Sequence, residues 1–406
     1  MQAPRSTPHL SRRRLLATGS ASAALVLFGC GGGSGDSLAG VGSGGTGSFT
    51  SGPIHGFGSI IVGGVRYDDS GARIATDSGA AAGNSDLRLG MVVEVNGSDI
   101  TTNAATGQRR ASASTISVRS EIEGPVTAIN AAAGTLTVLG QQVGVTAATV
   151  FDDDLRGGLA SLRVGQVVEI YGLMNAAGQY TATRIDDEDD ARRYKLRGPI
   201  SGLNTTARTF HIGGAILSFA GLSAPPAGLA NGQYARVELG TTPDAAGVWT
   251  VTRLQTTPTG TANLPATGRV HVELEGFVTA YTSSTRFAVN GVAVDASGVA
   301  RLPAGLQLGM RVEVEGMLDN GTLIAREVEL EDADGDDGLE VEGSISSVSP
   351  ATQSFVVRGV TIRHDAATRF IDGTPARIAV GVKVEVKGWL SADGTALSAS
   401  EVEFDD

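Results

Sequence analysis

Residues 286–294 read Arg-Phe-Ala-Val-Asn-Gly-Val-Ala-Val, two alternating apolar runs that meet at Asn290-Gly291. Alternation at period two predicts β-strands with one buried face. An Asn-Gly pair between such runs predicts a two-residue hairpin, because a type I′ turn needs positive φ at both central positions. Alternating segments at 272–280, 310–316 and 323–330 flank the hairpin, so this region predicts a small unit of short antiparallel strands.

The unit recurs five times. Each copy opens with Gly, one spacer and a β-branched residue, at Gly52, Gly124, Gly198, Gly276 and Gly343. A second anchor, an aliphatic residue three positions before Gly and a Val/Glu-rich segment after it, centres on Gly90, Gly165, Gly232, Gly309 and Gly381. Both series have the same spacing and therefore belong to one repeating unit. We expect the second glycines to be turn residues that lead into a strand.

The repeats divide the chain into five modules, for which we use the same names throughout. Their predicted bounds are 48–120 (module 1), 121–193 (module 2), 194–266 (module 3), 267–337 (module 4) and 338–406 (module 5). Short strands, many glycines and few aromatic residues predict an all-β tandem array of small antiparallel barrels like the OB-fold, with a short sandwich as the alternative. We expect contacts between successive modules to add stability, because each module is small.

Glutamates recur after the second glycine, at Glu94, Glu169, Glu313 and Glu385. Paired carboxylates can act as acid and base, but each of these stands within a Val-Glu-Val alternation, which favours a solvated strand face. Module 3 departs from the pattern, since Arg236 takes this place and a glutamate follows at Glu238. We expect an altered bulge or register there.

The first 29 residues are expected to be a lipoprotein signal peptide. Arg12 and Arg13 precede a short apolar run, too short to span a bilayer, in an arrangement that resembles the twin-arginine export signal; the general export route is the alternative. The run ends at Cys30, the only cysteine, in a context that resembles a bacterial lipobox. We expect acylation of Cys30, and a flexible Gly/Ser-rich tether over residues 30–47.

The charge balance argues against a nucleic-acid partner. The leader holds four of the 31 basic residues and no acid, so that 27 basic residues face 43 acidic ones in the remaining chain, a net charge of −16. Phosphate backbones need the opposite sign. The expected partners are the membrane, through the lipid anchor, and an envelope protein or a glycan.

Module 1 contains Gly56-Phe57-Gly58-Ser59 followed by Ile60-Ile61-Val62 and Gly63-Gly64-Val65. This stretch resembles the opening of the bacterial family called domain of unknown function 5666, in which Asn is usual where Gly63 stands. The resemblance covers module 1 well and the other modules through their anchors. It implies exported tandem barrels, often on lipoproteins, and it implies no known reaction.

The loop His55, Gly56, Phe57 and Gly58 occurs in module 1 alone and is a candidate ligand loop. The alternative is that Gly56 and Gly58 are turn residues around a core Phe57, which we favour. A pocket lined by residues from two adjacent modules would favour ligand binding, whereas a converging Ser/His/Asp cluster would favour an enzyme.

We expect no cofactor and no catalytic residue. Histidines lie singly in different modules, without local metal-ligand spacing. Asp332, Asp334 and Asp336 alternate as in the opening of a calcium-binding EF-hand loop, but Asp337 and Gly343 stand where that loop needs Gly and Glu, so they are weak calcium candidates. The sequence favours a non-enzymatic, lipid-anchored envelope protein that acts as a binding or spacing scaffold. The alternatives are a module for one glycan or a Ca²⁺-dependent partner and, more remotely, a hydrolase with an unrecognised site.

Overall fold

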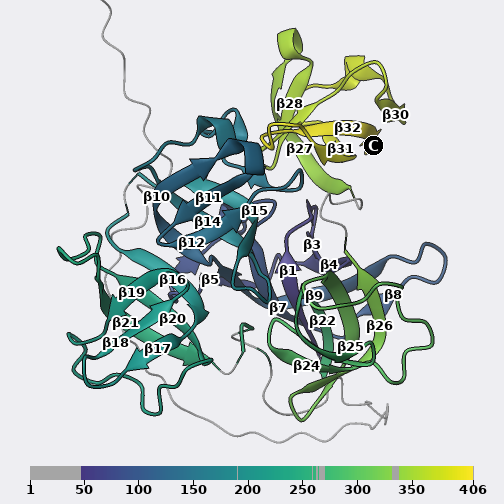
Figure 1. Cartoon of the computed structure of the whole chain (residues 1–406). Coiled ribbons are helices and arrows are strands. Elements are labelled where there is room, and N and C mark those ends of the chain that lie inside the picture. The colour runs from purple at the N-terminus through teal and green to yellow at the C-terminus, as the bar shows by residue number, and fades with distance from the viewer. Residues whose placement is uncertain are drawn as a thin grey trace, which may run out of the picture. The chain divides into compact units, whose positions relative to one another are not determined.

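The computed structural model describes residues 47–189, 191–257, 259–261, 264, 270–331 and 338–405. Its strands gather into five small closed barrels, so the predicted all-β tandem fold is confirmed (Figure 1). The described residues contain no α-helix, only five short 3₁₀ helices, η1 to η5.

Each barrel contains five principal strands, and modules 1, 2, 3 and 5 add short pieces. Module 1 comprises β1 (Ser48–Pro53), β2 (Gly56–Phe57), β3 (Ile60–Val62), β4 (Val65–Asp68), β5 (Arg73–Thr76), β6 (Ala81–Ala82), η1 (Asn84–Asp86), β7 (Val92–Gly97), β8 (Thr101–Thr102) and β9 (Arg109–Arg119). Module 2 comprises β10 (Ile122–Asn130), η2 (Ala131–Ala133), β11 (Thr135–Val138), β12 (Gln141–Gly144), β13 (Val150–Phe151), η3 (Gly158–Ser161), β14 (Val167–Met174) and β15 (Tyr180–Asp187).

The other three modules follow the same order. Module 3 comprises β16 (Tyr194–Pro199), β17 (Ser201–Asn204), β18 (Thr209–Ile212), β19 (Ala215–Ser218), β20 (Tyr234–Leu239) and β21 (Trp249–Thr257). Module 4 comprises β22 (Val270–Ser283), β23 (Arg286–Val289), β24 (Val292–Asp295), β25 (Arg311–Asp319) and β26 (Thr322–Leu330). Module 5 comprises β27 (Leu339–Ser349), η4 (Pro350–Thr352), β28 (Ser354–Val357), β29 (Val360–Arg363), β30 (Arg369–Ile371), η5 (Pro375–Arg377), β31 (Lys383–Leu390) and β32 (Leu397–Phe404).

Module 4 shows how each barrel closes. β22 pairs with β23, β23 with β24, β24 with β26, β26 with β25, and β25 again with β22. Four of these pairings are antiparallel and only β24–β26 is parallel, so the barrel is mainly antiparallel, as expected. The long connection after the third strand crosses the barrel end, and the third and last strands consequently run the same way. The corresponding parallel pairings are β4–β9, β12–β15, β19–β21 and β29–β32.

The predicted hairpin in module 4 is confirmed. Asn290 and Gly291 have φ values of 49° and 80°, as a type I′ turn requires, and they connect β23 directly to β24. Val289, Val292 and Val294 on either side of the turn are buried in the barrel core. The alternation of the sequence therefore places one face of each strand inside the barrel.

The second-anchor glycines all adopt positive φ, between 78° and 91°, before the fourth principal strand. In module 3 the residue three positions after this glycine, Ala235, pairs with Gly198, and the equivalent pairing occurs in the other modules, for example Val312 with Gly276. The bulge between the last two strands also falls at the same place in all five modules. The expected change of register or bulge in module 3 was wrong; what changes there is the charge of residue 236.

Strand pairing also joins modules that are distant in sequence. β1 of module 1 runs parallel to β22 of module 4, and β2 runs parallel to β27 of module 5. Modules 2 and 3, which are successive, pair antiparallel through β10 and β16. Module 1 therefore contacts modules 4 and 5 through its backbone as well as its side chains.

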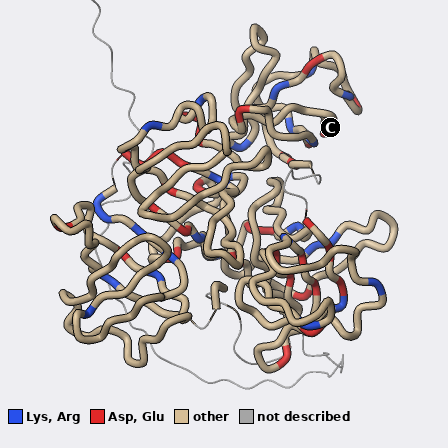
Figure 2. The backbone as a smooth tube through the Cα atoms, viewed as in Figure 1, with Lys and Arg blue, Asp and Glu red and all other residues tan. Residues whose placement is uncertain are grey.

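The recurring glutamates do not lie on a solvated face, so that interpretation was wrong. Glu94 is fully buried, and the side chains of Glu169 and Glu385 are 13% and 25% exposed. They point away from their own barrel core, as alternation predicts, but a neighbouring module or the connection to it covers them. Figure 2 marks the acidic and basic positions along the backbone, and a buried carboxylate is tolerated where a cation pairs with it.

Arg119 illustrates such a buried pairing. Its guanidinium contacts Glu94, lies 3.1 Å from Glu121 Oε1 and donates to the carbonyl of Gly260 at 2.6 Å. Burial alone lowers the pKa of this arginine, but Glu94 and Glu121 outweigh it and raise the pKa, so Arg119 stays charged. The end of module 1 is thus tied to the connection that precedes module 4.

Asp77 makes the corresponding link between modules 1 and 3. Its side chain, 5% exposed, accepts hydrogen bonds from Arg197 at 2.9 Å and from Arg236 at 3.1 and 3.2 Å, and Lys195 lies at 3.7 Å. Burial alone raises the pKa of this carboxyl, but the three cations outweigh it and hold the pKa at about 2.

We predict that Arg119→Ala lowers the free energy of unfolding by about 3–5 kcal/mol, because it leaves Glu94 and Glu121 buried without their cation. The control is Arg286→Ala, whose ion pair with Asp295 is largely exposed on the arginine side (68%) and should change stability by less than about 1 kcal/mol. Urea unfolding followed by circular dichroism measures both. An equal loss of unfolding free energy in the two variants would contradict the prediction that the buried pair stabilises the fold more than the exposed pair.

We predict that Asp77 stabilises the fold above its unfolded pKa of 3.8 and loses this effect as the pH falls toward 2. The lowered pKa corresponds to about 2 kcal/mol. The stability difference between the wild type and Asp77→Asn should therefore shrink by that amount between pH 5 and pH 2. A difference that stays constant over this interval would show that Asp77 does not titrate as the geometry requires.

Candidate functional site

The residues singled out from the sequence fall into two groups. Arg12, Arg13, Cys30 and the acidic triplet Asp332, Asp334 and Asp336 lie outside the described residues. The loop from His55 to Gly58 lies within them.

That loop joins module 1 to module 5. Gly56 and Phe57 form β2 and pair with Glu340 and Val341 of β27. A Cβ atom at Gly56 would come within 2.5 Å of the Glu340 carbonyl, so the close approach of the two backbones requires glycine. Phe57 is 2% exposed and belongs to the core, while His55 lies in the wall of a cavity.

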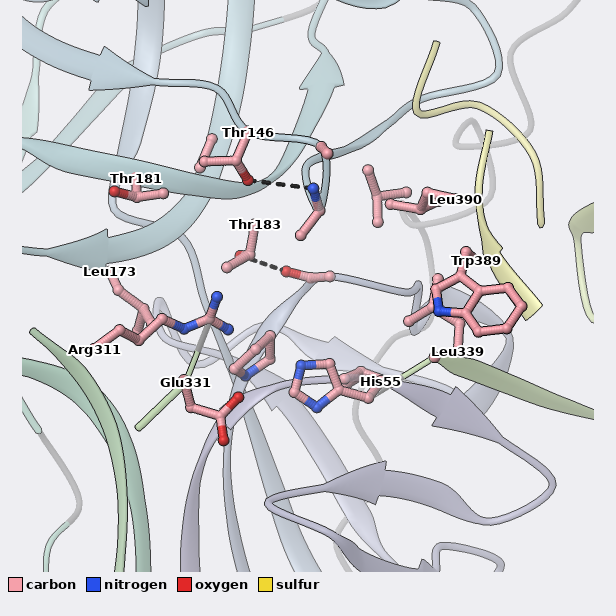
Figure 3. A pocket seen from close by; sticks show the side chains of 18 of the residues that line it. His55, Thr146, Leu173, Thr181, Thr183, Arg311, Glu331, Leu339, Trp389 and Leu390 are labelled. Atoms are coloured by element: carbon pink, nitrogen blue, oxygen red, sulfur yellow. Dashed lines mark hydrogen bonds between the residues drawn. The ribbon is translucent and has the colours of Figure 1, made fainter. Parts of the chain in front are cut away.

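This four-module cavity has a volume of about 230 Å³ and receives residues from modules 1, 2, 4 and 5. Representative lining residues are His55, Leu173, Phe277, Arg311, Glu331 and Trp389. Figure 3 shows Arg311 and Glu331 on one side and Trp389 on the other, with His55 between them. Apolar side chains make up much of the wall, and the charged groups are few.

The strand ends of module 4 position the two charged groups. Arg311 begins β25 and its Nε donates to Glu275 at 2.9 Å; burial alone lowers the arginine pKa, but Glu275 outweighs it and raises it. Glu331 follows β26, and its backbone N–H donates to the carbonyl of Arg311 at 3.0 Å. Trp389, on β31 of module 5, is 52% exposed, so its indole is available to a ligand.

Two of the threonine hydroxyl groups in the wall form hydrogen bonds with the backbone. Thr183 donates to the carbonyl of Gly90 at 2.6 Å, and Thr146 accepts from the N–H of Ala148 at 3.2 Å. Among the described residues that line the cavity there is no serine or cysteine. The wall thus offers an aromatic ring, apolar surface and a few polar groups, a combination that is common in small-molecule sites.

A second cavity, of about 310 Å³, lies where modules 1 to 4 approach one another, with Arg119, Glu121 and Tyr234 in its wall. Burial, followed by the Glu121 carboxylate, raises the pKa of Tyr234. Arg119 and Glu121 are already paired with each other, so this cavity is the interior of the joint described above.

Three modules carry a row of acids across the outside of the barrel, which sequence reasoning missed. In module 4 Glu275 lies opposite Glu313 and Glu313 opposite Glu329. The equivalent rows are Glu123, Glu169 and Asp186 in module 2 and Glu342, Glu385 and Glu403 in module 5. Glutamate therefore does not stand alone in its module, and directly opposed like charges are destabilising without a cation.

The rows of modules 2 and 5 are each approached by a cation from another module. Lys195 of module 3 lies 3.1 Å from Glu169 in module 2, and Arg66 of module 1 lies 3.9 Å from Glu385 in module 5. In module 4, burial and then the neighbouring carboxylates of Glu275 and Glu331 raise the pKa of Glu313 to about 8, so this glutamate is mostly protonated at neutral pH.

A second row in module 4 brings His271 beside two carboxylates. His271 and Glu273 are two residues apart on β22, so their side chains lie on the same face of the strand. Glu315 of β25 lies opposite Glu273. The sequence shows that His271 and Glu273 are two residues apart. It does not show that β22 pairs with β25, which brings Glu315 beside them.

Comparison with protein families gives one match. The model of the domain of unknown function DUF5666 matches residues 123–186, 275–329 and 342–403, which lie in modules 2, 4 and 5. Module 1, whose Gly-Phe-Gly-Ser stretch carried the resemblance, and module 3 are outside the matched regions although they share the strand circuit. No curated protein matches the chain.

No helix among the described residues has both the length and the apolar character needed to cross a membrane. The repeat, the barrels and the three matched regions agree with one another. The chain contains DUF5666 domains in tandem, in modules 2, 4 and 5.

Proposed function

We propose that this chain is a non-enzymatic, lipid-anchored protein of the cell envelope whose barrels together bind a small ligand in the four-module cavity. The observation that carries the proposal is that residues from modules 1, 2, 4 and 5 line one cavity. Small-molecule sites are commonly concave, mostly apolar and supplied with a few polar groups, often between domains.

The wall favours a saccharide ring as the ligand. The half-exposed indole of Trp389 offers a flat apolar surface on which the C–H face of a sugar can lie. Arg311, Glu331 and His55 supply hydrogen-bonding groups within the same cavity. A volume of about 230 Å³ is at the small end of ligand sites, which suits a single ring rather than a long glycan.

A spacing role remains the second candidate, and the buried ion pairs support it. Asp77 and Arg119 tie modules together through contacts that are shielded from water. Such joints would keep the modules at a constant distance. A spacer, however, gives no reason for an exposed tryptophan at the cavity.

The envelope location rests on the sequence alone. Arg12 and Arg13 begin an export signal, Cys30 follows a lipobox-like segment, and residues 31–47 are rich in Gly and Ser. Acyl chains on Cys30 would attach the chain to a membrane, with the Gly/Ser-rich segment as a spacer between the membrane and module 1.

We predict that Cys30→Ser moves the protein from the membrane fraction to the soluble fraction of the envelope, because it removes the acyl attachment site. The measurement is cell fractionation with mass spectrometry of the mature N-terminus. Ser34→Ala is the matched control and should leave the lipid mass in place. A wild-type N-terminus without an acyl group would contradict the anchor.

We predict that saccharides bind at Trp389 with dissociation constants in the micromolar to millimolar range. Trp249, which packs against Tyr194 in module 3 and is outside the cavity wall, serves as the control. In a Trp249→Phe background Trp389 is the sole tryptophan, so its fluorescence should change on titration with a panel of mono- and disaccharides. Trp389→Ala should weaken binding at least tenfold in calorimetry. The absence of any response at 10 mM across the panel, or binding that survives Trp389→Ala, would refute the site.

A further inference from the structure

His271, Glu273 and Glu315 bring three metal-ligating side chains together on the outside of module 4. His271 Nε2 lies 3.2 Å from Glu273 Oε1 and 3.3 Å from Glu315 Oε1. One ligand atom from each residue lies within 4.8 Å of the other two. Donors bound at 2.1 Å to a tetrahedral ion are about 3.4 Å apart, which is close to both measured separations.

The strands hold these side chains in place. Glu273 and Glu315 are directly opposite on β22 and β25, and β26 places Glu327 opposite Glu315. His271 precedes Glu273 by two residues and therefore points to the same face. Three opposed carboxylates create a demand for positive charge that His271 alone does not satisfy.

Module 1 supplies one cation to this cluster. Arg109, at the start of β9, contacts Glu273 and lies 3.2 Å from Glu315 Oε2. The guanidinium thus engages the same two carboxylates that would ligate a metal ion. Its side chain is 22% exposed, so it has room to move toward solvent.

The guanidinium of Arg109 leaves one carboxylate oxygen of the cluster without a hydrogen bond. Glu273 is completely buried, yet its Oε2 has no hydrogen-bond partner. A fully buried carboxylate oxygen without a donor is costly, and a cation bound to the same carboxylate would offset that cost. The unpaired oxygen is an observation that does not depend on the distances between the three ligands.

We propose that His271, Glu273 and Glu315 form a binding site for Zn²⁺, and that Zn²⁺ competes there with Arg109. One imidazole and two carboxylates are donors that zinc accepts in tetrahedral sites, with a fourth position left for water. Calcium is a poorer match because it takes six to eight oxygen ligands. The site is separate from the four-module cavity, so it does not depend on the saccharide proposal.

The first test is calorimetric titration of the purified full chain with ZnCl₂, accompanied by Co²⁺ absorption spectroscopy. We expect one site with a dissociation constant in the micromolar range and a tetrahedral Co²⁺ spectrum. His271→Ala should weaken Zn²⁺ binding at least a hundredfold. His211→Ala, which alters a strand histidine of module 3, should leave it unchanged.

The second test removes the competitor. Arg109→Gln should tighten Zn²⁺ binding at least tenfold, and Zn²⁺ should raise the melting temperature of this variant more than that of the wild type. The melting curve also reports whether the variant folds. Failure of both proteins to bind Zn²⁺ at 1 mM, or loss of binding in His211→Ala as large as in His271→Ala, would overturn the proposal.

Discussion

The structure depends on carboxylates that are buried between barrels and paired with cations from other modules. Removing two charges from water is expensive, and their attraction offsets that cost only when the geometry is close. Asp77 meets this condition with two arginines and a lysine of module 3, and Glu121 of module 2 meets it with Arg119 of module 1. Modules that met in another orientation would bury the same charges without partners, so the pairs select one arrangement.

The five modules share one backbone structure but differ in the charge of their outward-facing side chains. The positive-φ glycine, the strand circuit and the bulge occur in all five modules, whereas the outer row of three acids occurs in modules 2, 4 and 5. These are also the three regions that match the DUF5666 family. Module 3 places Arg236 where the others have glutamate, and module 1 contributes Arg66 and Arg109 to its neighbours. Modules 1 and 3 therefore supply cations to the acidic modules.

Local patterns predicted the local structure. Asn290-Gly291 predicted its turn, Val-Glu-Val predicted which face is inward, and the repeat predicted five small barrels, because each depends on a few adjacent residues. The sequence could not reveal what covers the outward face, and for that reason the glutamates were placed in solvent. The four-module cavity and the association of His271 with Glu315 could not be predicted for the same reason. Both require strand pairings and module contacts between segments that are distant in sequence. The charge at equivalent positions of the repeat was a usable signal, because Arg236 stands where the other modules have glutamate.

The parallel pairing of β1 with β22 has a consequence for synthesis. Ser48 and His271 are partners although 223 residues separate them, so the first strand of the chain is made long before the strand that covers its edge. Until module 4 emerges, that edge offers unpaired backbone groups to any other strand. This edge of β1 is therefore among the last to be covered during synthesis, and the nascent chain exposes it to other strands during that interval.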